Sequence, residues 1–137
     1  MEETLVQTDL LSIAQKNMEA YFETHDPKYV AEDAVFINQA TGEETHGREA
    51  VAQLLHQIYH VAFDAHAEVK NKMISSGKAM VEFTFVGKHI GEFAGIAPTQ
   101  KSVRVPLCVT YSLENGLIRE ARIYMMVNVL IDQLIKN

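Results

Sequence analysis

The residues best suited to proton-transfer chemistry lie on two segments with the alternation of β-strands. His89 ends the segment 78–89, just before a glycine-containing loop, and histidine exchanges protons near neutral pH without large tuning. Glu120 and Tyr124 lie on the segment 117–126. They would share one face of a strand, because side chains two residues apart point the same way. His89, Glu120 and Tyr124 are therefore the candidate catalytic residues.

Two of these candidates, His89 and Glu120, have a structural alternative. His89 could bond a carbonyl of the adjacent loop instead of a substrate. Glu120 and Arg122 would each need a partner in a cavity, because an unpaired buried charge is costly, and the alternative is a cross-strand ion pair on an exposed or interfacial sheet face. Alternation alone leaves open which face of the segment 117–126 looks inward. The site predictions assume that its even-numbered side chains do, with Met126 at the mouth of a pocket.

The predicted pocket is mostly apolar and would hold a small hydrophobic molecule. Its candidate side chains come from the early strand, the long helix and the later strands. Methionine suits such a lining, because its flexible, polarizable side chain fills irregular apolar space. The candidate ligand-binding residues are Phe36, Tyr59, Phe83, Phe85, Val109, Tyr111, Arg122 and Met126.

The sequence shows no convincing metal, nucleophile or phosphate motif. His56 and His60 can share a helix face, but no HExxH pattern and no third ligand accompany them, so two partly exposed histidines beside a core face are favoured over a zinc pair. The glycines of "GKHIGEFAG" follow a strand and open into a loop, whereas a dinucleotide fingerprint opens a helix. We therefore expect no metal and no cofactor.

The composition indicates one globular domain over residues 1–137. The formal net charge of −6 disfavours nucleic acid and acidic membrane surfaces as partners. The single cysteine, Cys108, cannot form an internal disulfide. The N-terminal stretch lacks the pattern of a signal peptide, and no apolar run has the ~18 residues of a membrane span. A cytoplasmic location is the resulting expectation.

The periodicity of apolar residues predicts an α+β fold, because runs of helix precede runs of strand. Asn115-Gly116 is a strong hairpin signal, and Pro106 indicates an edge position or a bulge within its strand. We expect a curved antiparallel sheet wrapped around the N-terminal helices as a cone, with a pocket between them. The predicted order is helix 5–22, short helix 27–31, strand 34–38, polar turn 39–47, helix 48–63, strands 64–75, 78–89, 101–114 and 117–126, and helix 127–135.

Four stretches together resemble the SnoaL-like polyketide cyclases of the nuclear transport factor 2-like superfamily. They are "GREAV", "GKHIGEFAGIAPTQKSVRVP", "LENGLIREARIY" and "LIDQL", and the similarity covers about residues 10–135. The resemblance implies the cone fold and a homodimer. It is much less specific for an activity, because cyclases, isomerases, dehydratases and non-catalytic binders share this superfamily.

In the cyclases of this family an acid near the end of the last strand acts on the substrate's acidic C–H. Here "RIYMMVNVL" keeps Tyr124 but has Met126 where that acid would align. Two main hypotheses remain open. The protein could be a cyclase- or isomerase-like enzyme on a small hydrophobic carbonyl compound, with His89 or Glu120 as base and Tyr124 or Arg122 stabilising negative charge. It could instead bind such a compound without chemistry. A structural role through dimerisation of the outer sheet face is a third option.

Overall fold

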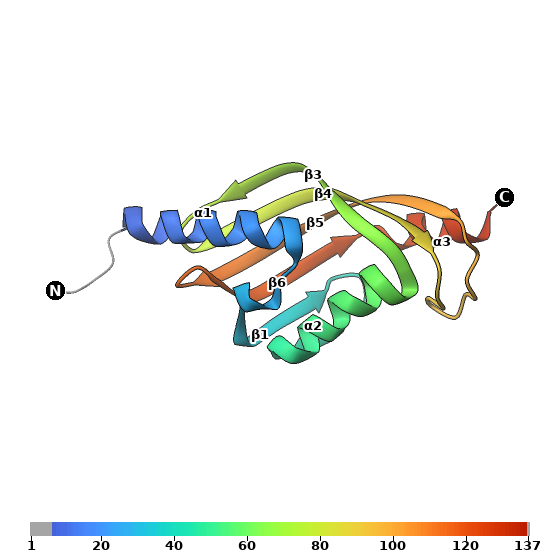
Figure 1. Cartoon of the computed structure of the whole chain (residues 1–137), viewed down its shortest axis with the longest axis horizontal. Coiled ribbons are helices and arrows are strands. Elements are labelled where there is room, and N and C mark those ends of the chain that lie inside the picture. The colour runs from blue at the N-terminus through green and yellow to red at the C-terminus, as the bar shows by residue number, and fades with distance from the viewer. Residues whose placement is uncertain (1–6, 137) are drawn as a thin grey trace.

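A computed structural model of the chain describes residues 7–136 as three α-helices, two short helices of other types and six strands (Figure 1). The predicted start of the first helix at residues 5–6 lies outside the described residues. In chain order the elements are α1 (Gln7–Thr24), the 3₁₀ helix η1 (Pro27–Tyr29), β1 (Val30–Asn38), β2 (Glu44–His46), α2 (Arg48–His56), the π-helix η2 (Gln57–Ala62), β3 (Phe63–Ile74), β4 (Lys78–His89), β5 (Ser102–Glu114), β6 (Leu117–Met125) and α3 (Val127–Ile135).

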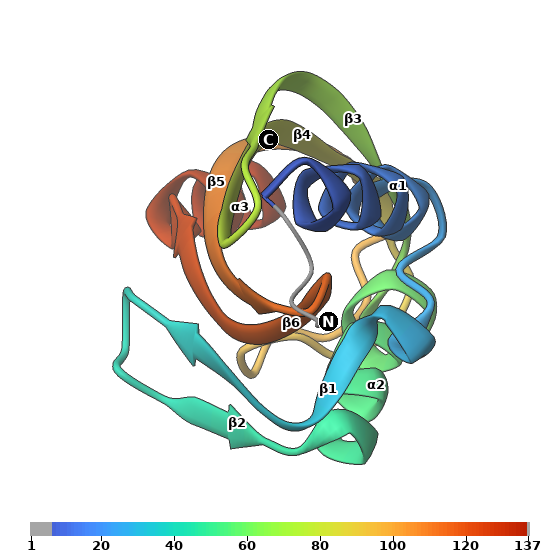
Figure 2. The same cartoon turned by 90° about the vertical axis from the view of Figure 1, so that its left-hand side faces the viewer.

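The six strands form one curved sheet in the order β2-β1-β6-β5-β4-β3. Figure 2 shows that the sheet bends around α1, which gives the predicted α+β cone. The last four strands form the predicted antiparallel meander. The sheet is nevertheless mixed, because β1 pairs with β6 in parallel. The prediction of a wholly antiparallel sheet is wrong at this one junction, where α2 and the meander separate the two strands in the chain.

The core fills the concave side of the sheet, and strict alternation places it there. Along β4 and β5 the odd-numbered residues are buried from Ala79 to Phe85 and from Val103 to Tyr111, and the residues between them are more exposed. Helix α1 adds Met18 and Tyr21 to this core. Each large apolar side chain removed from water stabilises the fold by about 1.5–3 kcal/mol, so the sheet is held firmly against the helices behind the site.

Three segment boundaries differ from the prediction. The expected helix 27–31 is a single 3₁₀ turn at Pro27–Tyr29, because β1 begins at Val30 and pairs there with Ile118. The predicted polar turn 39–47 contains β2, which extends the sheet by a three-residue edge strand. The expected helix 48–63 stops being α-helical after His56 and continues as the π-helix η2.

The Asn115-Gly116 hairpin is confirmed, and it anchors β5 and β6 beneath α1. Both residues have positive φ, 52° and 78°, as the type I′ turn requires. The side-chain amide of Asn17 donates to the carbonyl oxygen of Gly116 at 3.0 Å. A Cβ at Gly116 would come within 2.4 Å of a methyl group of Ile13, so only glycine allows the turn to approach the helix this closely.

Pro106 lies on the interior strand β5, which pairs with β4 on one side and β6 on the other. It is paired only with β4. The pairing of β5 with β6 runs no further than Leu107, which is opposite Met125, so Pro106 has no partner on that side, as an edge position requires. Two residues before Pro106, at Arg104, the side chain of Gln133 makes the backbone hydrogen bonds that a neighbouring strand would make. It accepts from the backbone N–H of Arg104 at 2.8 Å and donates to its carbonyl oxygen at 2.7 Å, which fixes α3 to the sheet.

Candidate functional site

The predicted orientation of β6 is wrong, and a β-bulge is the reason. Ile118 pairs with Leu113 but Glu120 pairs with Ser112, so Arg119 is an extra residue on β6. An extra residue reverses the in-out alternation. Beyond it the odd-numbered residues pack on the core, beginning with the fully buried Ala121.

The even-numbered side chains of β6 therefore lie on the outer face of the sheet. The carboxylate of Glu120 pairs with the guanidinium of Arg122 at 3.2 Å on the same strand. Tyr124 is 49% exposed, and Met126 is 50% exposed and forms the N-cap of α3 without a capping side chain. The exposed position considered for Glu120 and Arg122 is confirmed, but the cross-strand pairing is wrong, because the two residues pair with each other within β6. The predicted inward placement of Tyr124 and Met126 is wrong, because both side chains are exposed.

His89 is fully buried at the end of β4, where it holds the following loop. The backbone N–H of Thr99 donates to its Nδ1 at 3.1 Å, and the hydroxyl of Thr99 lies 3.0 Å from the same atom. Because Nδ1 accepts, the ring proton is on Nε2, which has no hydrogen-bond partner among the described residues. The partner is thus Thr99, and the loop carbonyl considered from the sequence is not involved.

The glycine after His89 brings the same loop against the end of η2. The N–H groups of Ile90 and Gly91 both donate to the carbonyl oxygen of Ala62 at 3.0 Å. A Cβ at Gly91 would lie 2.2 Å from the carbonyl oxygen of Val61, so no larger residue fits. The G-x-H-x-G motif therefore has a structural explanation: it fixes the loop 90–101 and supports the π-helix.

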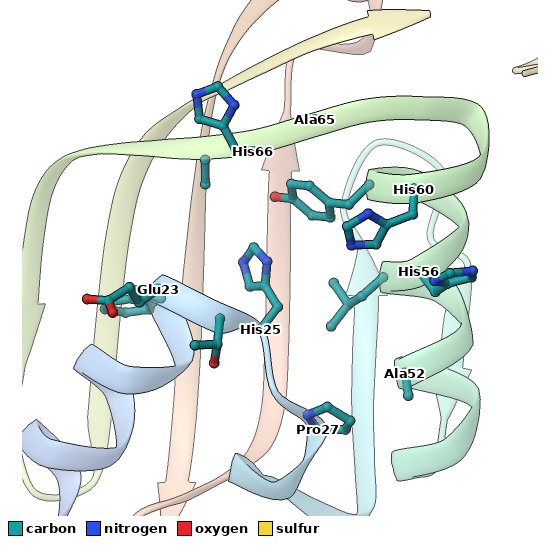
Figure 3. A pocket seen from close by; sticks show the side chains of 13 residues that line it. Glu23, His25, Pro27, Ala52, His56, His60, Ala65 and His66 are labelled. Atoms are coloured by element: carbon teal, nitrogen blue, oxygen red, sulfur yellow. The ribbon is translucent and has the colours of Figure 1, made fainter. Parts of the chain in front are cut away.

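A cavity of about 330 Å³ opens between the end of α1, the helices α2 and η2, and β3 (Figure 3). Its volume is at the lower end of the range for small-molecule sites. The lining combines apolar side chains with four of the six histidines in the chain. The residues are Phe22, Glu23, Thr24, His25, Pro27, Ala52, Leu55, His56, Tyr59, His60, Ala65, His66 and Ala67.

His25 occupies the centre of this cavity because of the way α1 ends. It follows the last residue of the helix and adopts φ 53°, a left-handed conformation that histidine tolerates better than most residues. Its backbone N–H donates to the carbonyl oxygen of Tyr21 at 2.7 Å, which closes the helix. The next residue, Asp26, accepts from the N–H of Lys28 and starts η1. The ring of His25 is thus fixed between two helices.

The π-helix η2 supplies the opposite side. Its wider turn places Tyr59 inward, with the ring centroid 4.7 Å from that of His25. His60 follows and points toward His25 in Figure 3. His56 lies next to it, 5.5 Å between ring centroids, and points away from the cavity centre. π-helical turns occur frequently at functional sites, and here the turn brings two polar side chains to one opening.

Burial sets the protonation of the central groups. Desolvation, with a smaller contribution from repulsion by His60, lowers the pKa of His25 to about 4. Burial raises the pKa of Tyr59 well above its ordinary value. At neutral pH the cavity therefore presents a neutral imidazole, which can donate and accept, beside an un-ionised phenol. Such a pair can form hydrogen bonds with a hydroxyl or carbonyl group of a bound molecule. His25 can also accept a proton from that molecule.

Of the predicted ligand-binding residues, only Tyr59 lines this cavity. The ring of Phe85 packs against Tyr59, 5.3 Å between centroids, and Phe63 connects Phe85 to His89. His89 is therefore separated from the cavity by aromatic rings. The remaining apolar candidates are core residues behind it: Phe36, Phe83, Val109 and Tyr111.

The sequence reasoning missed His25 and His60. The signal for His25 was present, because "THDP" follows a strong helical pattern and histidine at a helix end can point sideways into a neighbouring space. His60 could not be placed, because a regular α-helix was expected there. The four histidines do not gather around one point, and no group of three metal-ligating side chains is found in residues 7–136.

Comparison with protein families decides the relationship. The model of the SnoaL-like polyketide cyclases matches residues 12–134. The chain belongs to this family. No curated protein matches it. Within residues 7–136 no helix has the length and apolar character needed to cross a membrane.

Solved structures support the fold of this SnoaL-like protein. A protein assigned as a SnoaL-like polyketide cyclase from Jannaschia sp. CCS1 superposes with a TM-score of 0.82 at 14% identity, covering 100% of this chain and 99% of that chain. AclR from Streptomyces galilaeus, assigned as a hydroxylase, gives 0.72 at 22%, covering 96% and 84%. A phenazine biosynthesis-related protein from Pseudomonas aeruginosa gives 0.76 at 15%, covering 98% and 88%. At these identities the likeness shows the fold alone.

Proposed function

We propose that this SnoaL-like protein binds a compact, mostly apolar molecule carrying a hydroxyl or carbonyl group in the cavity at the end of α1. The observation that carries the proposal is the packing of the His25 ring against the Tyr59 ring inside that cavity, with 4.7 Å between the ring centroids. Apolar lining with a few fixed polar groups is the usual composition of a small-molecule site. The neutral imidazole and the phenol of this pair supply those polar groups.

Acid–base catalysis on the bound molecule is the second candidate, and the conformation of His25 favours it. Backbone strain at a non-glycine residue often accompanies a functional side chain. His25 combines a positive φ with a ring held neutral by burial. It would act as the base in place of His89, Glu120 and Tyr124. Its low pKa makes it a weak base, because efficient proton transfer needs a pKa near the working pH, so binding is the better-supported function.

Binding is tested with 2-naphthol, a neutral bicyclic alcohol. We expect saturable binding by calorimetry in the wild type and weaker binding in Tyr59→Phe by about fivefold, since one hydrogen bond contributes about 1 kcal/mol. Tyr124→Phe removes a similar hydroxyl from the outer face and serves as the matched control. Equal losses in both variants, or no binding to the wild type, would contradict the proposal.

Catalysis is tested with 2-tetralone, a ketone with an acidic C–H. If His25 abstracts that proton, the wild type in D₂O will exchange deuterium into the ketone faster than buffer does, and His25→Asn will remove the acceleration. Asparagine tolerates the left-handed backbone but cannot accept the proton. If the wild type binds the ketone but exchange proceeds at the buffer rate, catalysis by His25 is rejected and binding alone remains the proposed function.

We further propose a homodimer formed through the outer face of the sheet. The supports are the resemblance to the family and the character of this face. It exposes Tyr124 and a hollow of about 520 Å³ that contains Met73, Met80 and the Glu120–Arg122 pair. An aromatic ring, methionines and one arginine are side chains enriched at protein interfaces. This role accounts for β6 side chains that cannot reach the cavity.

A further inference from the structure

We propose that the cavity accepts the carboxylate form of an aromatic or alicyclic acid between His25 and His60, and that His25 takes up a proton when this anion binds. The inference rests on the proposed binding function and names the ligand class for the same site. Its starting point is the type of polar residue that the cavity contains. Histidines supply four of the thirteen lining residues, and the lining has no lysine or arginine among the described residues.

The geometry gives the anion a defined position. His25 approaches from the end of α1 and His60 from η2, and their rings point toward the same space (Figure 3). Repulsion by His60 is the smaller of the two causes that lower the pKa of His25, after desolvation. The phenol of Tyr59, beside His25, provides a third donor. A carboxylate can accept from all three, and its apolar part would lie against Leu55 and Phe22 on the same lining.

Within residues 7–136, the side chains that line this space include no fixed cation. On α1, the carboxylate of Glu23 points away from the two rings (Figure 3). Just before η1, the carboxylate of Asp26 accepts from the backbone N–H of Lys28. On β3, His66 points away and lies 3.6 Å from the carboxylate of Glu68, which also binds Arg104. Behind the cavity lie Tyr21 and Tyr111, and burial raises the pKa of both phenols, so their rings are un-ionised.

An anion in this setting must be neutralised by a proton. Moving a carboxylate out of water is costly unless an opposite charge pairs with it. In the empty cavity desolvation keeps His25 neutral. A bound carboxylate a few ångströms away reverses the balance, because a nearby opposite charge favours the protonated imidazole. Binding is therefore linked to proton uptake, and acidification strengthens it.

The probe pair is 2-naphthoate and 2-naphthamide, which share shape but differ in charge. Calorimetry at about pH 6 and pH 8, in buffers of different ionisation enthalpy, measures affinity and proton uptake together. We expect the naphthoate affinity to rise by up to about tenfold per pH unit on acidification, with uptake approaching one proton per ligand. The affinity of the amide should stay constant. His25→Asn should reduce the pH dependence, and His46→Gln, on strand β2 and outside the cavity lining, should not.

The possible results distinguish proton-linked anion binding from the proposed binding of a neutral molecule. If 2-naphthol binds but naphthoate binds without proton uptake, the anion inference is overturned and the binding function stands. If neither probe binds, both fail. Proton uptake that persists unchanged in His25→Asn also overturns the inference, because the proton is then taken up elsewhere. Circular dichroism of each variant verifies that it is folded.

Discussion

A single side chain, His25, connects the stability of the fold with the chemistry of the cavity. Its ring is enclosed by Tyr21 and Tyr59, with centroids 5.2 and 4.7 Å away. This enclosure lowers the pKa of His25 to about 4, whereas histidine in an unfolded chain titrates near 6.5. Between these values the unfolded chain binds a proton that the folded protein excludes, so acid destabilises the fold through this residue.

The pH dependence of unfolding measures this effect. Above pH 6.5 His25 is neutral in both the folded and the unfolded state, so it contributes nothing to the pH dependence of the free energy of unfolding. As the pH falls toward 4, up to about 3 kcal/mol of stability is lost through this residue. Urea denaturation at about pH 7 and pH 4.5 should therefore show a larger loss for the wild type than for His25→Asn. The same loss in both proteins would show that His25 is not the group excluded from protonation.

At the scale of elements, the loop after β4 supports the π-helix that carries Tyr59 and His60. We predict that Gly91→Ala destabilises the protein by about 1–3 kcal/mol, because the new methyl group meets the carbonyl oxygen of Val61 and forces the loop away from η2. Chemical denaturation gives the value. Gly77→Ala is the matched control, because a Cβ there has no neighbour within 4 Å and the backbone has no positive φ. Equal stability of the two variants would contradict this role of Gly91.

The start of α3 gives a second test at this scale. Met126 is the N-cap and offers no side-chain acceptor. Met126→Asp should stabilise the protein by about 0.5–2 kcal/mol, because the carboxylate can accept from the first free N–H groups of the helix. Met125→Asp should destabilise it, since Met125 packs against the core. The melting temperatures of the two variants should move in opposite directions. A decrease in both would place residue 126 inside the fold.

The periodicities of the sequence were sufficient for most elements and insufficient for the site. Alternation located β4 and the core face of β5, and Asn115-Gly116 located the hairpin. The bulge at Arg119 could not be seen, because one extra residue leaves no mark in composition yet turns Glu120 and Tyr124 outward. The π-helix was hidden for a related reason, since Gln57–Ala62 continues the apolar spacing of the helix before it. Both irregularities decide which side chains reach the cavity.

At the scale of the whole molecule, the two faces of the sheet differ in what they present. The concave face holds the core and the cavity, and the outer face presents the hollow and Tyr124. We predict that the protein sediments as a dimer at micromolar concentration and that Tyr124→Glu shifts it toward monomer, because a buried unpaired charge opposes association. Glu49→Lys on α2, which also changes an exposed charge, should leave the dimer intact. A monomeric wild type would contradict the proposed interface.

The most direct test of the account is to map where a small ligand binds. Two-dimensional ¹H–¹⁵N NMR of the labelled protein, titrated with 2-naphthol, reports each backbone amide separately. We predict that the shifted amides cluster at the end of α1 and along η2 and β3, around His25, Tyr59 and Ala65. Shifts confined to the outer face of β6, around Glu120, Arg122 and Tyr124, would contradict the claim that the binding site lies at the end of α1.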